Sequence, residues 1–144
     1  MVDRTRRRFE RLRGGRTITC SLGEAAGVAM GDPVLFEVAL TNVLENAIRY
    51  SPDGGAIALS SFPRGGSIVV QVADDGPGVP ESELPRLFDK FYRGSAAKRT
   101  PGTGLGLSIV RGVMQGMGGQ ADAELRADAP HGMVLSLVLP AVRV

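Results

Sequence analysis

Apolar side chains recur at the period of an α-helix over residues 32–49. Asp32 is a favourable N-cap and Pro33 suits a first helical turn, so we expect a helix from there to about Arg49, ended by Pro52 and Gly54. At about 100° per residue, its apolar residues form one stripe: Phe36, Leu40, Val43, Leu44 and Ala47. The opposite side is polar: Glu37, Thr41, Asn42, Glu45, Asn46 and Arg49.

A second helical pattern begins at Leu105 and is stopped by Gly118 and Gly119. Its apolar residues are expected to be buried: Ile109, Val110, Val113, Met114 and Met117. The two methionines are interpreted as core residues, because a flexible thioether fills gaps in apolar interiors. Residues 81–94 predict a shorter helix that carries Leu87, Phe88 and Phe91.

Outside the predicted helices, short runs of residues are typical of β-strands. They are residues 16–22, 27–30, 56–62, 67–75, 123–127 and 132–140. The turn sequence "PRGG" predicts a hairpin between the third and fourth runs, and the last two runs predict a second hairpin. Residues 132–140 are nearly all apolar, which indicates a central strand. We therefore predict an α+β fold, a two-layer α/β sandwich in which helices cover one face of a mixed sheet, with loops around one pocket.

Composition restricts the classes of function. The chain has 144 residues, 43% of them hydrophobic, which suits one domain with its own core, and no run of about 18 apolar residues predicts a membrane span. Cys20 and His131 are the only residues of their kinds, so an internal disulfide is excluded and a Cys-based zinc cage or a catalytic histidine triad is not expected.

The first sixteen residues carry a cluster of positive charge. Its members are Arg4, Arg6, Arg7, Arg8, Arg11, Arg13 and Arg16. Such a run can meet nucleic acid or anionic lipid. We favour the solvated end of a helix from an upstream segment, closed by Gly14 and Gly15, and expect no nucleic-acid partner.

Three motifs are candidates for chemistry, and each is weak alone. Asn42 and Asn46 lie one turn apart near the border of the apolar stripe, as two solvated amides or as oxygens aimed at a ligand. The D-x-G-x-G pattern from Asp74 places a carboxylate at a strand end before a turn, or is simply an acidic β-turn. "PGTGLGLSIV", residues 101–110, matches neither common phosphate-loop pattern and fits a phosphate loop or a glycine-rich turn.

Taken in order, four segments resemble the N, G1, F and G2 boxes of the ATP-binding catalytic domain of sensor histidine kinases, which has the Bergerat ATP fold. The segments are "NVLENAIRYSP", "DDGPGVP", "LFDKFYRG" and "GTGLGLSIV". The resemblance extends from Gly31 to Pro140, and "HGMVLSLVLP" is similar to the last strand of that family. "LFDKFYRG" with "RRFERL" is also similar to potassium-responsive sensor kinases.

The resemblance implies ATP and Mg²⁺ as cofactors. It implies that Asn46 coordinates Mg²⁺ together with nucleotide phosphates, that Asn42 lies beside the phosphates, and that Arg49 supplies positive charge. Tyr50 would pack on adenine, and Asp74 would accept a hydrogen bond from the adenine amino group. Asn42, Asn46 and Arg49 are thus the expected catalytic residues.

The remaining expected ATP contacts come from loops. Gly76 and Gly78 would let the chain turn around the base, while backbone N–H groups near the second helix would bind phosphates. The full set adds Val79, Phe91, Arg93, Gly102, Thr103, Gly104, Leu105, Gly106 and Leu107. The polar composition of residues 93–103 is typical of a lid, and the ATP lid is expected over about residues 88–103.

The resemblance also implies a mechanism and partners. ATP-hydrolysing relatives have a glutamate where this chain has Asn42, so we expect the γ-phosphoryl group to pass to an imidazole of a separate phosphoacceptor domain. His131 does not lie in a phosphoacceptor motif, so autophosphorylation of this chain alone is not expected. A non-catalytic nucleotide-sensing or interaction module is the alternative, and a free-standing ATPase is a third possibility.

The expected organisation is a linker or helix end over residues 1–15 and a catalytic domain over residues 16–144. We expect this chain to be a monomer taken from a longer kinase, since dimerisation belongs to the part that carries the phosphoacceptor. A response regulator is the expected further partner. The expected location is the cytoplasm, with a parent protein that can be anchored in the inner membrane.

Overall fold

The computed structural model describes residues 17–22, 31–51, 55–89, 106–126 and 131–141. In chain order the elements are β1 Thr17–Leu22, α2 Pro33–Tyr50, β2 Ala56–Arg64, β3 Ser67–Ala73, the 3₁₀ helix η2 Glu81–Arg86, α3 Gly106–Gly116, β4 Gln120–Leu125 and β5 Met133–Pro140. The strand predicted at residues 27–30 lies outside the described residues, as do residues 1–15 and most of the expected lid.

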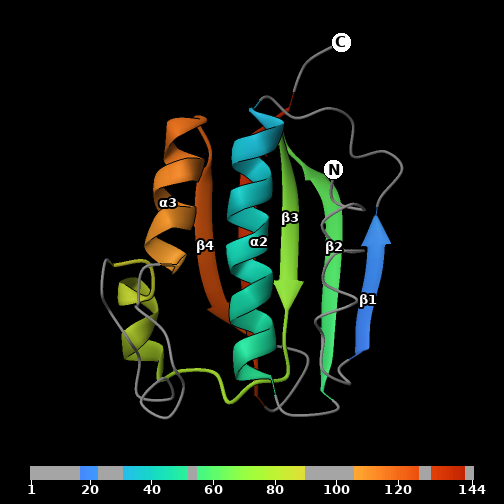
Figure 1. The fold of residues 1–144 in the computed structure, drawn as a ribbon, viewed down its shortest axis with the longest axis vertical. Helices are drawn as coiled ribbons and strands as arrows, with labels where there is room; N and C mark the ends of the chain where they lie inside the picture. Colours follow the sequence, from blue (N-terminus) through green and yellow to red (C-terminus); the bar gives the residue numbers. More distant parts are fainter. Residues whose placement is uncertain (1–16, 23–30, 52–54, 90–105, 127–130, 142–144) are drawn as a thin grey trace.

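The five strands form one mixed sheet with the order β1-β2-β3-β5-β4 (Figure 1). β1 pairs with β2 in parallel, and the other three pairs are antiparallel. Both predicted hairpins are confirmed, since β2 pairs with β3 and β4 pairs with β5. β5 lies between β3 and β4, which confirms the central position predicted from its apolar composition.

Helix α2 begins as its sequence predicts. The Asp32 side chain accepts hydrogen bonds from the backbone N–H groups of Val34 at 2.8 Å and Leu35 at 3.4 Å. The predicted apolar stripe is buried, and the buried residues of the helix are Phe36, Ala39, Leu40, Val43, Leu44 and Ala47. The local cap and the apolar period therefore place the polar side of α2 away from the core.

Helices α2 and α3 lie together on one face of the sheet, which confirms the predicted two-layer architecture (Figure 1). Side chains from both helices and from β2, β3 and β5 form one core cluster. Val110 and Met114 of α3 are buried in it, as predicted. The prediction for Ile109 was wrong: its side chain is 44% exposed, because a helix in the outer layer has only one covered side.

The helix predicted over residues 81–94 is shorter and of another type. The described part is the 3₁₀ helix η2, and Leu87 and Phe88 follow it in a turn. Pro85 lies inside η2 and cannot donate a backbone hydrogen bond, which favours a short 3₁₀ segment over an α-helix. Phe88 is buried in the core cluster, whereas Phe91 lies outside the described residues.

None of the helices in the described ranges is long and apolar enough to cross a membrane.

Candidate functional site

Asn42 of α2 lies beside the start of α3. Its Nδ2 donates a hydrogen bond of 2.9 Å to the carbonyl oxygen of Val38, one turn earlier in the same helix. Its Oδ1 would lie only 3.3 Å from a Cβ atom at Gly106, the first residue of α3. The missing Cβ therefore allows the amide oxygen to approach the N-terminal end of α3.

The other predicted residues of α2 follow Asn42 toward the end of the helix. Asn46 comes one turn later and is half-buried, Arg49 is exposed, and Tyr50 is half-buried. The carbonyl oxygen of Tyr50 would lie 2.8 Å from a Cβ atom at Gly76, so the end of α2 packs against the loop after β3. The structure thus brings together two segments that the sequence analysis assigned to one site.

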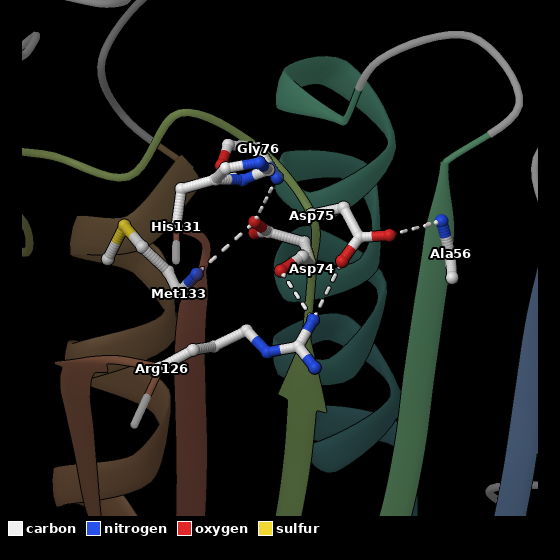
Figure 2. A network of polar contacts seen from close by, with 7 residues as sticks. All are labelled: Ala56, Asp74, Asp75, Gly76, Arg126, His131 and Met133. Carbon is white, nitrogen blue, oxygen red and sulfur yellow. Dashed lines mark hydrogen bonds and ion pairs between the residues drawn. The ribbon is translucent and has the colours of Figure 1, made fainter. Parts of the chain in front are cut away.

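Asp74 is the buried carboxylate of this loop, with 4% of the residue exposed. Its Oδ1 accepts hydrogen bonds from the backbone N–H groups of Gly76 at 2.8 Å and Met133 at 3.3 Å (Figure 2). The Asp74 N–H donates to the Met133 carbonyl at 3.0 Å, which continues the contact between β3 and β5. Within the described residues, no hydrogen bond engages the other carboxylate oxygen, Oδ2.

Burial raises the pKa of the Asp74 carboxyl group above its ordinary value. The hydrogen bonds from Gly76 and Met133 and the charge of Arg126 act in the opposite direction, and the charge of Asp75 adds to the rise. A buried carboxylate with an uncommitted oxygen is therefore held at the end of β3, where it favours a ligand that donates a hydrogen bond.

The glycines after Asp74 have conformational roles that the motif predicted. Gly76 leaves room for the Tyr50 carbonyl, and Gly78 has a φ of 70°, which L-residues with a side chain adopt rarely. Val79 is half-buried and packs against the core cluster. The loop therefore runs from the buried carboxylate back to the helical layer.

Sequence reasoning missed a polar network around this loop (Figure 2). Asp75 pairs through Oδ1 with the guanidinium of Arg126 at 2.8 Å, and its Oδ2 accepts a hydrogen bond from the Ala56 N–H at 2.9 Å. His131 Nδ1 lies 3.0 Å from the carbonyl oxygen of Gly76. One signal was available: Arg126 is the only arginine or lysine between Arg111 and Arg143.

The start of α3 completes the described part of the site. Gly106 begins the helix beside Asn42, and Leu107 is half-buried against the core cluster. Arg111 pairs with Asp89 at 3.2 Å, which links α3 to the turn after η2. The remaining predicted residues lie outside the described residues: Phe91, Arg93, Gly102, Thr103, Gly104 and Leu105.

The described part of the site offers mainly amide and backbone atoms as possible ligands for a metal ion. In the parts of the chain that the structure describes, no group of three or more His, Cys, Asp or Glu residues could hold a metal ion. A divalent cation here would need oxygen atoms from a ligand, which Mg²⁺ commonly takes from phosphates. Asn42 and Asn46 of α2 each carry an amide oxygen, a kind of ligand atom that such a cation accepts.

Comparisons with known proteins identify a family and its relatives. The family model described as histidine kinase-, DNA gyrase B-, and HSP90-like ATPase matches residues 31–143. Among curated proteins, the sensor protein SphS of Synechococcus elongatus is 39% identical over 110 residues, which are 70% of this chain. The histidine-protein kinase/phosphatase MprB of a Mycobacterium species is 34% identical over 97% of this chain, and the sensor protein KdpD of Escherichia coli is 36% identical over 85% of it.

A solved structure of a mycobacterial sensor histidine kinase MprB has the same fold. Its TM-score is 0.88 at 30% identity, with 99% of this chain and 95% of that chain covered. The full-length relatives are much longer, since this chain spans 26% of SphS, 27% of MprB and 14% of KdpD. The similarity therefore covers only part of each of these three relatives.

Proposed function

Because this chain belongs to the family of histidine kinase-, DNA gyrase B-, and HSP90-like ATPases, we propose that it is the catalytic ATP-binding domain of a sensor histidine kinase. It binds ATP with Mg²⁺ and transfers the γ-phosphoryl group to a histidine on a separate phosphoacceptor domain of the same kinase. The sequence relatives and the similar solved structure are sensor kinases, which supports this reading over the wider family.

One observation carries the proposal. Three segments that are far apart in sequence converge: the polar side of α2, the loop after β3 and the start of α3 (Figure 1). Asn42 approaches Gly106, and Tyr50 approaches Gly76, so the two predicted halves of a nucleotide site share one helix. A base would lie near Asp74 and the phosphates near the N-terminal end of α3, where the helix dipole favours anions.

The described residues have distinct roles in this proposal. Asp74 accepts a hydrogen bond from the adenine amino group, and Tyr50 and Val79 contact the base. Asn46 and Asn42 present oxygen or amide groups to the cation and the phosphates, and Arg49 adds positive charge. The bound Mg²⁺ would neutralise phosphate charge. The roles of Phe91, Arg93, Gly102, Thr103, Gly104 and Leu105 remain predictions.

We propose that the chain positions the γ-phosphoryl group for transfer and does not activate a water molecule. At Asn42 an amide replaces the carboxylate that would activate a water molecule, so transfer to an incoming imidazole depends on alignment and charge neutralisation. His131 is not the proposed acceptor, because the sequence around it does not match a phosphoacceptor motif. The phosphoacceptor domain and a response regulator are therefore the proposed partners, and this chain alone is proposed to be a monomer that works on the cytoplasmic side.

Calorimetric titration with a non-hydrolysable ATP analogue and Mg²⁺ tests the nucleotide site. Asp74→Asn should weaken binding about 10- to 100-fold, because a charged hydrogen bond contributes about 1.5–3 kcal/mol. Asn46→Ala should make binding less dependent on Mg²⁺. Asp122→Asn, an exposed change of the same kind on β4, serves as the control. Absence of binding by folded wild-type chain would contradict the proposal and favour the interaction module.

Incubation with labelled ATP separates the kinase from its alternatives. Acid-labile phosphate should appear on an added phosphoacceptor domain of a related sensor kinase, and none on His131. A non-catalytic module would give no transfer, and a free-standing ATPase would release phosphate steadily from this chain alone. Labelled His131 would contradict the proposed need for a separate substrate domain.

A further inference from the structure

Arg126 directly follows β4, and its side chain extends along the end of the sheet to the loop after β3 that contains Asp74 (Figure 2). Its NH1 atom donates to the carbonyl oxygen of Asp74 at 3.1 Å and pairs with Asp75 Oδ1 at 2.8 Å. Its side chain is only 17% exposed. Because the pair is half-shielded from water, its attraction is stronger than that of a fully exposed ion pair.

The contacts of Arg126 and of its partner Asp75 connect the ends of four strands: β2, β3, β4 and β5. Asp75 carries the connection to β2 through the Ala56 N–H, and the Arg126 N–H donates to the carbonyl oxygen of Gly132 at 3.1 Å. The guanidinium is thus held by the β4–β5 connection and in turn holds the backbone between Asp74 and Asp75.

The backbone position of Asp74 decides the direction of its carboxylate. Its N–H and its Oδ1 are bonded to Met133 and Gly76, and Arg126 takes its carbonyl oxygen. Removal of the guanidinium would leave a carbonyl and a shielded carboxylate without this partner, which favours rotation of the peptide toward water. Such a rotation would move Oδ2, the carboxylate oxygen that is left for the adenine amino group because Oδ1 already accepts from Gly76 and Met133.

We propose that Arg126 is a positioning residue for base recognition, which holds the Asp74 carboxylate toward the 6-amino group of adenine without contacting the nucleotide. This inference rests on the proposed function and adds a residue that determines specificity. The predicted effect of Arg126 concerns only the 6-amino group of the ligand. A nucleotide that lacks this group can therefore distinguish the effect from a general loss of folding.

The test compares two nucleotides that differ only in that group: ATP and purine riboside triphosphate, in which hydrogen replaces the 6-amino group. Wild-type chain should bind ATP about 10-fold more tightly, as expected for one charge-assisted hydrogen bond. Arg126→Ala should lose most of this preference, with a fall in ATP affinity approaching about 10-fold and little change for the purine analogue. Arg126→Lys should retain part of it, because an ammonium can donate to both oxygens from a shorter side chain.

Arg64→Ala, which removes an exposed arginine at the far end of β2, should leave both affinities unchanged. Equal losses for both nucleotides in Arg126→Ala would overturn the inference in favour of a purely structural role, and unchanged affinities would overturn it as well. If Arg126→Ala does not fold, Asp75→Asn provides the same comparison with the ion pair weakened. A wild-type chain that binds neither nucleotide would instead refute the proposed function, and this role with it.

Discussion

At the scale of single residues, burial makes ionisation of the Asp74 carboxyl group unfavourable for stability. The same carboxylate can accept a hydrogen bond from a ligand. Burial raises its pKa above the ordinary value of 3.8, so the folded chain holds this proton more tightly than the unfolded chain. The stabilising contribution of the protonated Asp74 carboxyl group is therefore fully present below pH 3.8. It is lost as the pH rises through the raised pKa of the folded chain. A ligand that donates a hydrogen bond to the carboxylate would offset this loss.

Asp74→Asn should remove this pH dependence, because an amide keeps the shape and an acceptor oxygen but does not titrate. Relative to wild-type chain, the variant should gain free energy of unfolding as the pH rises upward from 3.8. Urea denaturation of both chains across this range measures the difference, with Asp122→Asn as the charge-matched control. A difference that moves in the opposite direction would show that the hydrogen bonds and Arg126 outweigh burial.

At the scale of elements, two glycines have opposite relations to their surroundings. Gly132 precedes β5 with a φ of 113°, and a Cβ atom there would overlap the backbone carbonyl oxygen of Asp74. Gly112 lies exposed in α3, and a Cβ atom there would meet nothing within 4 Å. The β4–β5 connection therefore requires its glycine, whereas the helix does not.

Alanine at these two positions should have opposite effects. Gly132→Ala should lower the free energy of unfolding by about 3 kcal/mol or more, through backbone strain and overlap with the Asp74 carbonyl. Gly112→Ala should raise it by about 0.5–1 kcal/mol, because alanine is the better helix former. Thermal and urea unfolding of both variants test this. Similar effects at both sites would mean that the connection relaxes away from Asp74.

At the scale of the whole molecule, stability depends on one core shared by two layers. Leu44 of α2 is 0% exposed between the helices and the sheet, whereas Leu35 of the same helix is 43% exposed. Leu44→Ala should cost about 2–5 kcal/mol and Leu35→Ala less than about 1 kcal/mol. Helix propensity changes equally in both, so urea denaturation isolates the packing contribution. Equal losses would contradict the layered core.

Much of the fold was predictable because its causes are local. The cap at Asp32, the apolar stripe of α2 and the two hairpins depend on residues close in sequence, and all of them are confirmed. Ile109 was assigned to the core from its period alone, which does not specify how wide the covered side of α3 is. The 3₁₀ geometry of η2 was missed although Pro85 signals it.

The candidate site was predictable only in part, for the same reason. The motifs identified Asn42, Asn46 and Asp74 as polar residues in positions where a core explanation was poor. Their convergence, and the approaches of Gly106 to Asn42 and of Gly76 to Tyr50, depend on helix packing and strand order.

By itself, the sequence determined most of the elements, the N-cap and apolar face of α2, and membership of an ATP-binding family, because these depend on short-range periodicity and on motifs. Only the tertiary structure decided which polar groups meet. Arg126 and Asp75 are 51 positions apart, and the isolated positive charge of Arg126 in its segment does not specify which carboxylate it meets. They meet because β5 pairs with both β3 and β4, which brings the ends of these strands to one edge beside Asp74.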